Sequence, residues 1–164
     1  MADVEKSFPC GRQRDSAPPP KTTQTLGARM ASFHGSCLCQ TIQYKIIGEP
    51  KAFYLCHCSR CRKVTGSAHA SNLFVHVESM QWLAGESMIS SYRVPDTRFA
   101  KSFCSQCSSA VPSLRPPSHV LIPAGSLDSE PELTPQAHIS CASRAAWDDG
   151  FANLECIPGL PGSK

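Results

Sequence analysis

Seven cysteines in three short groups give this sequence its clearest capacity for chemistry. They follow the pattern C-x-C, C-x-C-x-x-C, C-x-x-C, at Cys37 and Cys39, then Cys56, Cys58 and Cys61, then Cys104 and Cys107. Zinc takes four tetrahedral ligands and binds thiolates readily, and close cysteine pairs are typical of its protein sites. The pattern therefore predicts metal binding.

A secreted disulfide scaffold is the competing interpretation, because the chain has ten cysteines in 164 residues. Such a scaffold needs an export signal, and residues 1–14 contain no apolar core. Organellar transit peptides contain few acidic residues, whereas this N-terminal segment has Asp3, Glu5 and Asp15. We therefore expect a cytoplasmic protein with reduced thiols, in which close cysteine pairs act as metal ligands.

Counting ligands separates the cysteines into two sets. The two outer pairs supply four thiolates and can close a tetrahedral site, whereas the middle group supplies three and leaves one position open. The open position could take water, hydroxide or an added thiol, as in catalytic zinc sites. We expect two zinc ions per chain: a structural one held by Cys37, Cys39, Cys104 and Cys107, and a catalytic one held by Cys56, Cys58 and Cys61.

Three cationic residues lie within or just after the middle group, at Arg60, Arg62 and Lys63. A zinc ion with three thiolates has a formal charge near minus one, which these side chains would offset. We expect them to bind an anionic substrate. A thiol that entered the open position would lose its proton, because coordination stabilises the thiolate.

Other hypotheses leave no open position. His57 could be a fourth ligand, although adjacent ligands fit poorly around one tetrahedral ion, and another histidine or Cys141 could close the site from elsewhere. Both zinc ions would then be structural, and the protein would be a non-catalytic module that binds a protein partner.

Short strands are the elements expected to position these thiols. Apolar and polar residues alternate over Thr41–Ile46, which is the period of a half-buried strand, and Gly48-Glu49-Pro50 is expected to end that strand. Similar patterns recur at 52–55, 68–77, 81–84, 88–94, 98–103, 119–122 and 137–140. Fourteen prolines and ten glycines argue against long helices.

The fold class predicted from these patterns is mainly β. We expect a small zinc-bound antiparallel β-sheet domain with at most one or two helical turns, one of them at Arg62–Thr65 and ended by Gly66. Residues 1–31 are Pro-rich without apolar periodicity, so we expect a disordered leader there and one zinc-binding domain over residues 32–160.

Two classes of partner are not expected. A net charge of +3 does not provide the concentrated basic face that nucleic-acid binding needs. No apolar run approaches the ~18 residues of a membrane span.

Three motifs resemble the glutathione-dependent formaldehyde-activating enzyme family, also called the centromere protein V-type domain family. They are Gly35–Cys39, Cys56–Ser67 and Phe103–Cys107, and the likeness extends over about residues 33–158. The resemblance implies a zinc-dependent, mainly β fold shared with methionine-R-sulfoxide reductases and a Rab-binding exchange accessory protein. By that fold analogy Cys141 would be the nucleophile of a sulfoxide reductase, a hypothesis that is disfavoured because such chemistry does not need the three additional thiols. It also implies the same division into a structural and a catalytic zinc site.

The activity implied by the resemblance is that of a zinc-dependent carbon–sulfur lyase. Such an enzyme condenses a small aldehyde such as formaldehyde with a thiol such as glutathione, or releases the aldehyde in the reverse reaction. Its partners are that small thiol and that aldehyde. Gln40 and Ser108 stand where the family usually has glycine, and both positions are expected in turns.

Overall fold

The structure, a computed structural model, describes residues 29–150 and 154–161 of the 164-residue chain. Backbone contacts separate a body over Leu26–Ala145 from a second unit, to which the described residues after Ala145 belong. The leader expected over residues 1–31 lies outside the described residues except for its last three. The domain bounds 32–160 stay a prediction.

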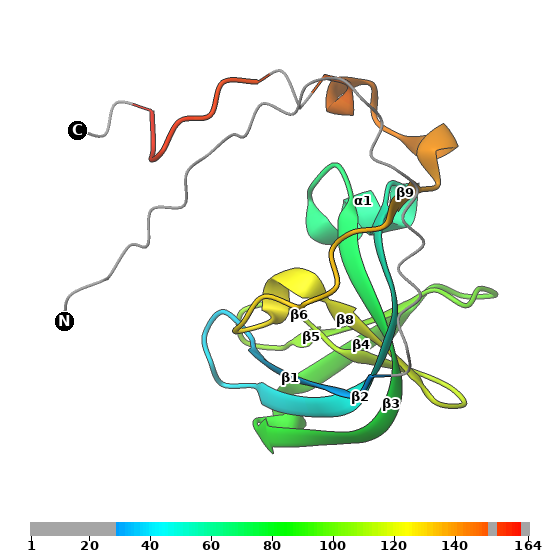
Figure 1. The fold of residues 1–164 in the computed structure, drawn as a ribbon, viewed down its shortest axis with the longest axis vertical. Helices are drawn as coiled ribbons and strands as arrows, with labels where there is room; N and C mark the ends of the chain where they lie inside the picture. Colours follow the sequence, from blue (N-terminus) through cyan, green and yellow to red (C-terminus); the bar gives the residue numbers. More distant parts are fainter. Residues whose placement is uncertain (1–28, 151–153, 162–164) are drawn as a thin grey trace. The chain divides into compact units, whose positions relative to one another are not determined.

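A six-stranded sheet forms the larger part of the body (Figure 1). Its strands are β1 (Ala31–Ser36), β2 (Gln43–Cys56), β3 (Ala70–Ala84), β7 (Ser113–Arg115), β8 (His119–Pro123) and β9 (Ala137–Ile139). The order is β1-β2-β3-β8-β7, with β9 also beside β2. Only the β2–β9 pair is parallel among these. Strand β2 is long enough for two neighbours on one edge, because β1 pairs with its first half and β9 with its end.

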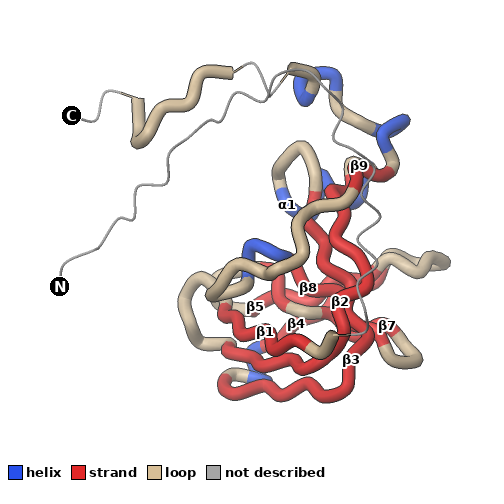
Figure 2. Tube along the Cα trace, viewed as in Figure 1, coloured by secondary structure: helices blue, strands red, loops and turns tan. Residues whose placement is uncertain are grey.

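A second sheet has three antiparallel strands in the order β4-β5-β6. They are β4 (Ile89–Arg93), β5 (Ala100–Cys104) and β6 (Ala110–Val111). The described residues contain one α-helix, α1 (Ser59–Thr65), which Figure 2 shows as a short blue segment. It ends at Gly66, which has the left-handed conformation, so the predicted end of the helix is correct. Short 3-10 turns lie at η1 (Glu86–Met88), η2 (Ala124–Ser126), η3 (Cys141–Ser143) and, in the second unit, η4 (Ala146–Asp148). The predicted mainly β class is confirmed.

The main core lies on one face of the larger sheet. Alternate residues of β2, β3 and β8 are fully buried there, among them Tyr44, Ile46, Leu73 and Ile122. Each buried aliphatic side chain of this kind stabilises the fold by about 1.5–3 kcal/mol. A second, smaller cluster joins Cys37, Ile42, Cys104 and Val111. It contacts both sheets, so the outer thiol pairs belong to the packing between them.

Two strand boundaries differ from the prediction. Gly48-Glu49-Pro50 does not end a strand: β2 continues through it with register shifts at Ile47/Gly48 and Pro50/Ala52. A β-bulge accommodates proline, and the missing Cβ of Gly48 allows close approach of the His76 carbonyl on β3. The predicted strands at 68–77 and 81–84 likewise form one strand, β3. Among the described residues, no helix is both long and apolar enough to cross a bilayer.

Candidate metal centres and the adjoining cavity

The outer pairs lie in two tight loops of similar design. One loop joins β1 to β2, and in it the N–H of Gln40 donates to the Cys37 carbonyl at 2.8 Å. The other joins β5 to β6, and in it the N–H of Ser108 donates to the Cys104 carbonyl at 2.9 Å. Gln40 and Ser108 have φ values of 60° and 61°, the left-handed conformation that glycine adopts most easily. The expectation that both positions serve turns is correct.

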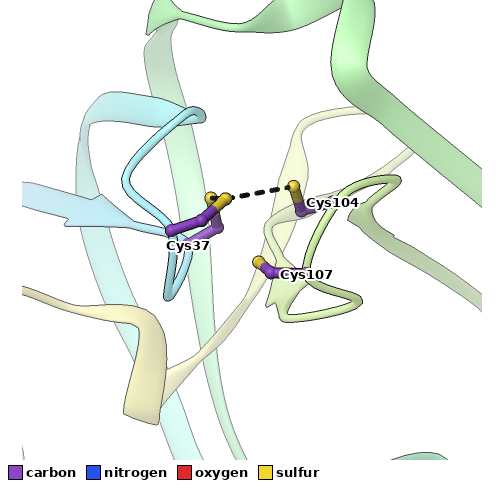
Figure 3. Close-up of side chains that lie close together, drawn as sticks. Cys37, Cys104 and Cys107 are labelled. Atoms are coloured by element: carbon purple, nitrogen blue, oxygen red, sulfur yellow. Dashed lines mark hydrogen bonds between the residues drawn. The ribbon is translucent and has the colours of Figure 1, made fainter.

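These loops bring four thiols together. The Sγ atoms of Cys37, Cys39, Cys104 and Cys107 lie within 4.8 Å of one another. The Cys37–Cys39 and Cys39–Cys104 sulfur distances are 3.4 and 3.8 Å. Figure 3 shows Cys37 on one loop facing Cys104 and Cys107 on the other. Zinc–sulfur bonds of about 2.3 Å place the sulfurs of a regular tetrahedron about 3.8 Å apart, so the donor set fits a zinc ion. We call it the four-thiol set.

Thiols of the four-thiol set differ in their tendency to ionise. Burial raises the pKa of Cys37 to about 11. The hydrogen bond between the Cys107 sulfur and Ser109 Oγ, 3.4 Å long, lowers the pKa of Cys107 to about 5. Thr41 likewise lowers the pKa of Cys39 through a 3.3 Å hydrogen bond. A metal cation would favour the thiolate form of all four.

The middle group is positioned by the end of β2 and the start of α1. Cys56 is the last residue of β2 and pairs with Ala70 on β3 and with Ile139 on β9. Cys58 is the N-cap of α1, and its sulfur accepts the N–H of Cys61 at 3.4 Å. The three sulfurs lie within 4.8 Å of one another and form the three-thiol set.

Ionisation within the three-thiol set also varies. Burial raises the pKa of Cys61. Burial acts in the same direction on Cys58, but hydrogen bonding from Cys61 and other neighbours outweighs it, and the pKa of Cys58 is lowered. In the described part of the chain, no further histidine, cysteine or carboxylate ligand atom joins the set. Its donors suit zinc and leave one tetrahedral position for another group.

His57 does not point into the three-thiol set but belongs to a histidine cluster. Its side chain is fully buried, and its Nε2 lies 2.7 Å from Nδ1 of His138. The ring of His69 lies 5.2 Å from that of His57. Cys141 is exposed, and its sulfur faces the His138 carbonyl at 3.5 Å. Neither His57 nor Cys141 is therefore placed as a fourth ligand.

The cations predicted to bind substrate all lie on α1. The Arg60 guanidinium is 5.6 Å from the centre of the Phe99 ring. Arg60 and Lys63 are exposed, and Arg62 is half-buried. Their substrate contacts stay a prediction.

A cavity of about 720 Å³ adjoins both thiol sets, since it is bordered by Cys37 and by Cys61. Serine and threonine hydroxyls from β3, β5, η2 and the connecting loops provide much of its polar lining. Its charged lining residues within the described chain are Lys101, Arg115 and Asp128, together with the titratable His69. None of the α1 cations borders it. Sequence reasoning missed Lys101 and Arg115, which lie far from the thiol motifs along the chain.

Comparison with known proteins supplies a family. The family described as glutathione-dependent formaldehyde-activating enzyme matches residues 32–143, which contain both thiol sets. Among solved structures, the chain is similar to a Rhodobacter sphaeroides protein at 17% sequence identity and a TM-score of 0.51. That match covers 64% of this chain and 98% of the other, and at this identity it shows a shared fold alone. A search of curated proteins found no match.

Proposed function

This chain belongs to the glutathione-dependent formaldehyde-activating enzyme family, and on that premise we propose that it joins a small aldehyde to a small thiol at the three-thiol set. The preferred pair is formaldehyde and glutathione, as the family description indicates. The observation that carries the proposal is a set of three sulfurs, with no fourth protein ligand in the described chain, beside a cavity that Cys61 borders.

Metal content is part of the proposal. We assign two zinc ions per chain, one to the four-thiol set and one to the three-thiol set. The first would tie the β1–β2 loop to the β5–β6 turn, so its binding free energy would add to folding stability. The second, when bound, would lower the pKa of a substrate thiol.

The reaction is a simple addition. The substrate sulfur gives up its proton and attacks the formaldehyde carbon, so that a carbon–sulfur bond forms as the carbonyl π bond breaks. The oxygen then takes a proton, which gives the hydroxymethyl thioether, and the reverse steps make the protein a carbon–sulfur lyase. No oxidant or reductant is needed.

The chain's own contribution is to hold the reactants together. The cavity would keep the thiol beside Cys61 and limit the orientations of both reactants, which lowers the entropic part of the barrier. On α1, Arg60, Arg62 and Lys63 supply positive charge near the three thiolates. They would offset the negative charge of that set and favour the approach of an anionic thiol.

An exchange experiment tests the proposal. The as-purified, zinc-loaded protein is added to glutathione and 13C-formaldehyde, and the interconversion rate of free and bound formaldehyde is followed by NMR. We expect the rate to rise in proportion to protein concentration, and Cys61→Ser to remove the increase. Cys141→Ser is the matched control and should retain it. A wild-type rate equal to that of buffer at every protein concentration would reject the proposal.

A further inference from the structure

The charged residues around the cavity favour a particular kind of ligand. A space of about 720 Å³ lies within the range of about 300–1,000 Å³ typical of small-molecule sites, and is far larger than formaldehyde needs. Most of it must therefore serve the thiol partner. Arg115 and Lys101 provide positive charge along the wall, and Asp128 provides a single carboxylate.

We propose that Arg115 is the anion-binding residue of this cavity and contacts a carboxylate of the thiol substrate, with Lys101 as a second positive charge. The inference rests on the proposed function for the identity of the ligand as a thiol. It goes beyond that function because it assigns substrate recognition to β5 and β7 rather than to α1.

The backbone holds the Arg115 guanidinium in place. One terminal nitrogen donates to the Ala100 carbonyl at 2.7 Å, and the other donates to the Arg98 carbonyl at 3.3 Å. A guanidinium has five N–H groups in a planar fork, so these bonds leave three donors without a protein acceptor in the described chain. A fixed fork of this kind suits a carboxylate, because little side-chain entropy is lost on binding.

Arg115 also forms no ion pair with a carboxylate among the described residues. It is half-buried, whereas Arg29 and Lys51 each have a glutamate partner, Glu132 and Glu49. Burial lowers the pKa of Arg115, and the neighbouring Arg93 acts in the same direction, while Cys61 opposes them. An arginine stays charged at neutral pH despite such a shift. A bound carboxylate would supply the ion-pair partner that the described residues do not provide.

Asp128 adds a negative charge to the cavity lining, which therefore offers charges of both signs to a zwitterionic ligand. One of its carboxylate oxygens accepts the Ser36 hydroxyl at 2.7 Å, and the side chain is exposed, so an ammonium group can still approach it. The ligand class that fits is a peptide-sized thiol with carboxylates and a free amine. A γ-glutamyl thiol peptide such as glutathione has these groups.

The test compares binding affinities while two things are changed in turn: Arg115 on the protein and the free carboxylates on the ligand. Dissociation constants for glutathione and for its diethyl ester, which lacks free carboxylates, are measured by calorimetry on the wild type, Arg115→Gln and Arg115→Lys. A charge-assisted pair stabilises a complex by about 1.5–3 kcal/mol, so the wild type should prefer glutathione by about 10- to 150-fold. The preference should fall to about 3-fold or less in Arg115→Gln and to an intermediate value in Arg115→Lys.

Control variants separate this role from a general loss of structure or charge. A merely structural defect would weaken both ligands equally and leave the preference unchanged. Lys51→Gln removes one charge outside the cavity and should keep the wild-type preference, whereas Arg60→Gln tests the alternative that the α1 cations recognise the carboxylates. An unchanged preference in Arg115→Gln, or a loss of preference in Arg60→Gln alone, would overturn the inference. If Arg115→Gln does not fold, a preference unchanged in both Arg115→Lys and Lys101→Gln would overturn it as well.

The exchange assay on the same samples keeps the two proposals apart. Acceleration by the wild type, with the carboxylate preference retained in Arg115→Gln, rejects the anion-binding role and leaves the proposed function standing. Carboxylate preference that depends on Arg115, without any acceleration of formaldehyde exchange, supports the anion-binding role and rejects the proposed function.

Discussion

Cys58 and Cys39 offer the sharpest contrast between the two thiol sets at the scale of single residues. Serine is a good N-cap, so Cys58→Ser should keep the start of α1 while it weakens the three-thiol set. Cys39→Ser should weaken the link between two loops. We expect Cys58→Ser to lose one of two zinc ions with little change in Tm, and Cys39→Ser to lower Tm by at least about 5 °C.

Metal stoichiometry by native mass spectrometry and thermal unfolding by circular dichroism measure these effects. Equal destabilisation by the two substitutions would show that both sets are structural. That outcome would favour the non-catalytic module that binds a protein partner.

Gln40 and Ser108 have locally unfavourable backbone conformations. Both have positive φ, where a side chain is less favourable than glycine by about 1 kcal/mol. We predict that Gln40→Gly and Ser108→Gly each raise the free energy of unfolding by about 0.5–1 kcal/mol, measured by denaturant titration of the zinc-loaded protein. Ser105 lies in the same turn as Ser108 but does not have a positive φ, so Ser105→Gly should not raise the free energy of unfolding. A gain as large from Ser105→Gly would refute the explanation.

At the scale of elements, alternation of apolar and polar residues was enough to predict the fold class and most strand locations. It was wrong at Gly48-Glu49-Pro50, because a bulge keeps β2 paired with β3 where local propensity alone indicates an end. It also missed β1, whose pairing with β2 is a tertiary contact. The helix was found, since Gly66 ends it, but its start at Ser59 depends on capping by Cys58.

Gly35 of β1 packs closely against both β2 and η2. A Cβ at this position would collide with the Tyr44 hydroxyl and the Ser126 carbonyl. Tyr44 is fully buried on β2 and forms a 2.7 Å hydrogen bond with Ser126 Oγ of η2. Gly35→Ala should therefore lower the free energy of unfolding by about 1–3 kcal/mol, through overpacking. Gly125→Ala is the matched control, because a Cβ added there would have open space around it, and it should change stability by less than about 0.5 kcal/mol. Denaturant unfolding measures both, and similar losses would contradict the steric explanation.

At the scale of the whole molecule, sequence spacing predicted which sulfurs meet but not the surroundings of the three-thiol set. Local motifs indicate which thiols lie close together, because C-x-C and C-x-x-C turns place two sulfurs near each other without help from distant residues. The cavity depends instead on how β3, β5, η2 and the β7 region face one another. Arg115 lies far along the chain from Cys61, so proximity in sequence pointed to Arg60, Arg62 and Lys63.

The four-thiol set joins loops of the two sheets, so removing the zinc ion that we propose there should affect the two sheets unequally. Cys37 and Cys39 precede β2 in the larger sheet, whereas Cys104 and Cys107 belong to the end of β5 and its following turn. Without metal, the link depends mainly on the small cluster around Ile42 and Val111. The larger sheet keeps its own core on β2, β3 and β8. We therefore predict that chelation raises amide hydrogen exchange in β4–β6 at least about tenfold more than in β2 and β3, because local opening follows the weakest contacts.

Hydrogen exchange followed by mass spectrometry, before and after chelation, measures this difference. Cys58→Ser without chelator is the control: it should keep wild-type exchange in β4–β6, since it leaves the four-thiol set intact. Uniform loss of protection across both sheets would mean that the sheets unfold as one unit. Unchanged exchange after complete metal removal would mean that the apolar cluster alone holds them together, and the structural role of the four-thiol set would be rejected.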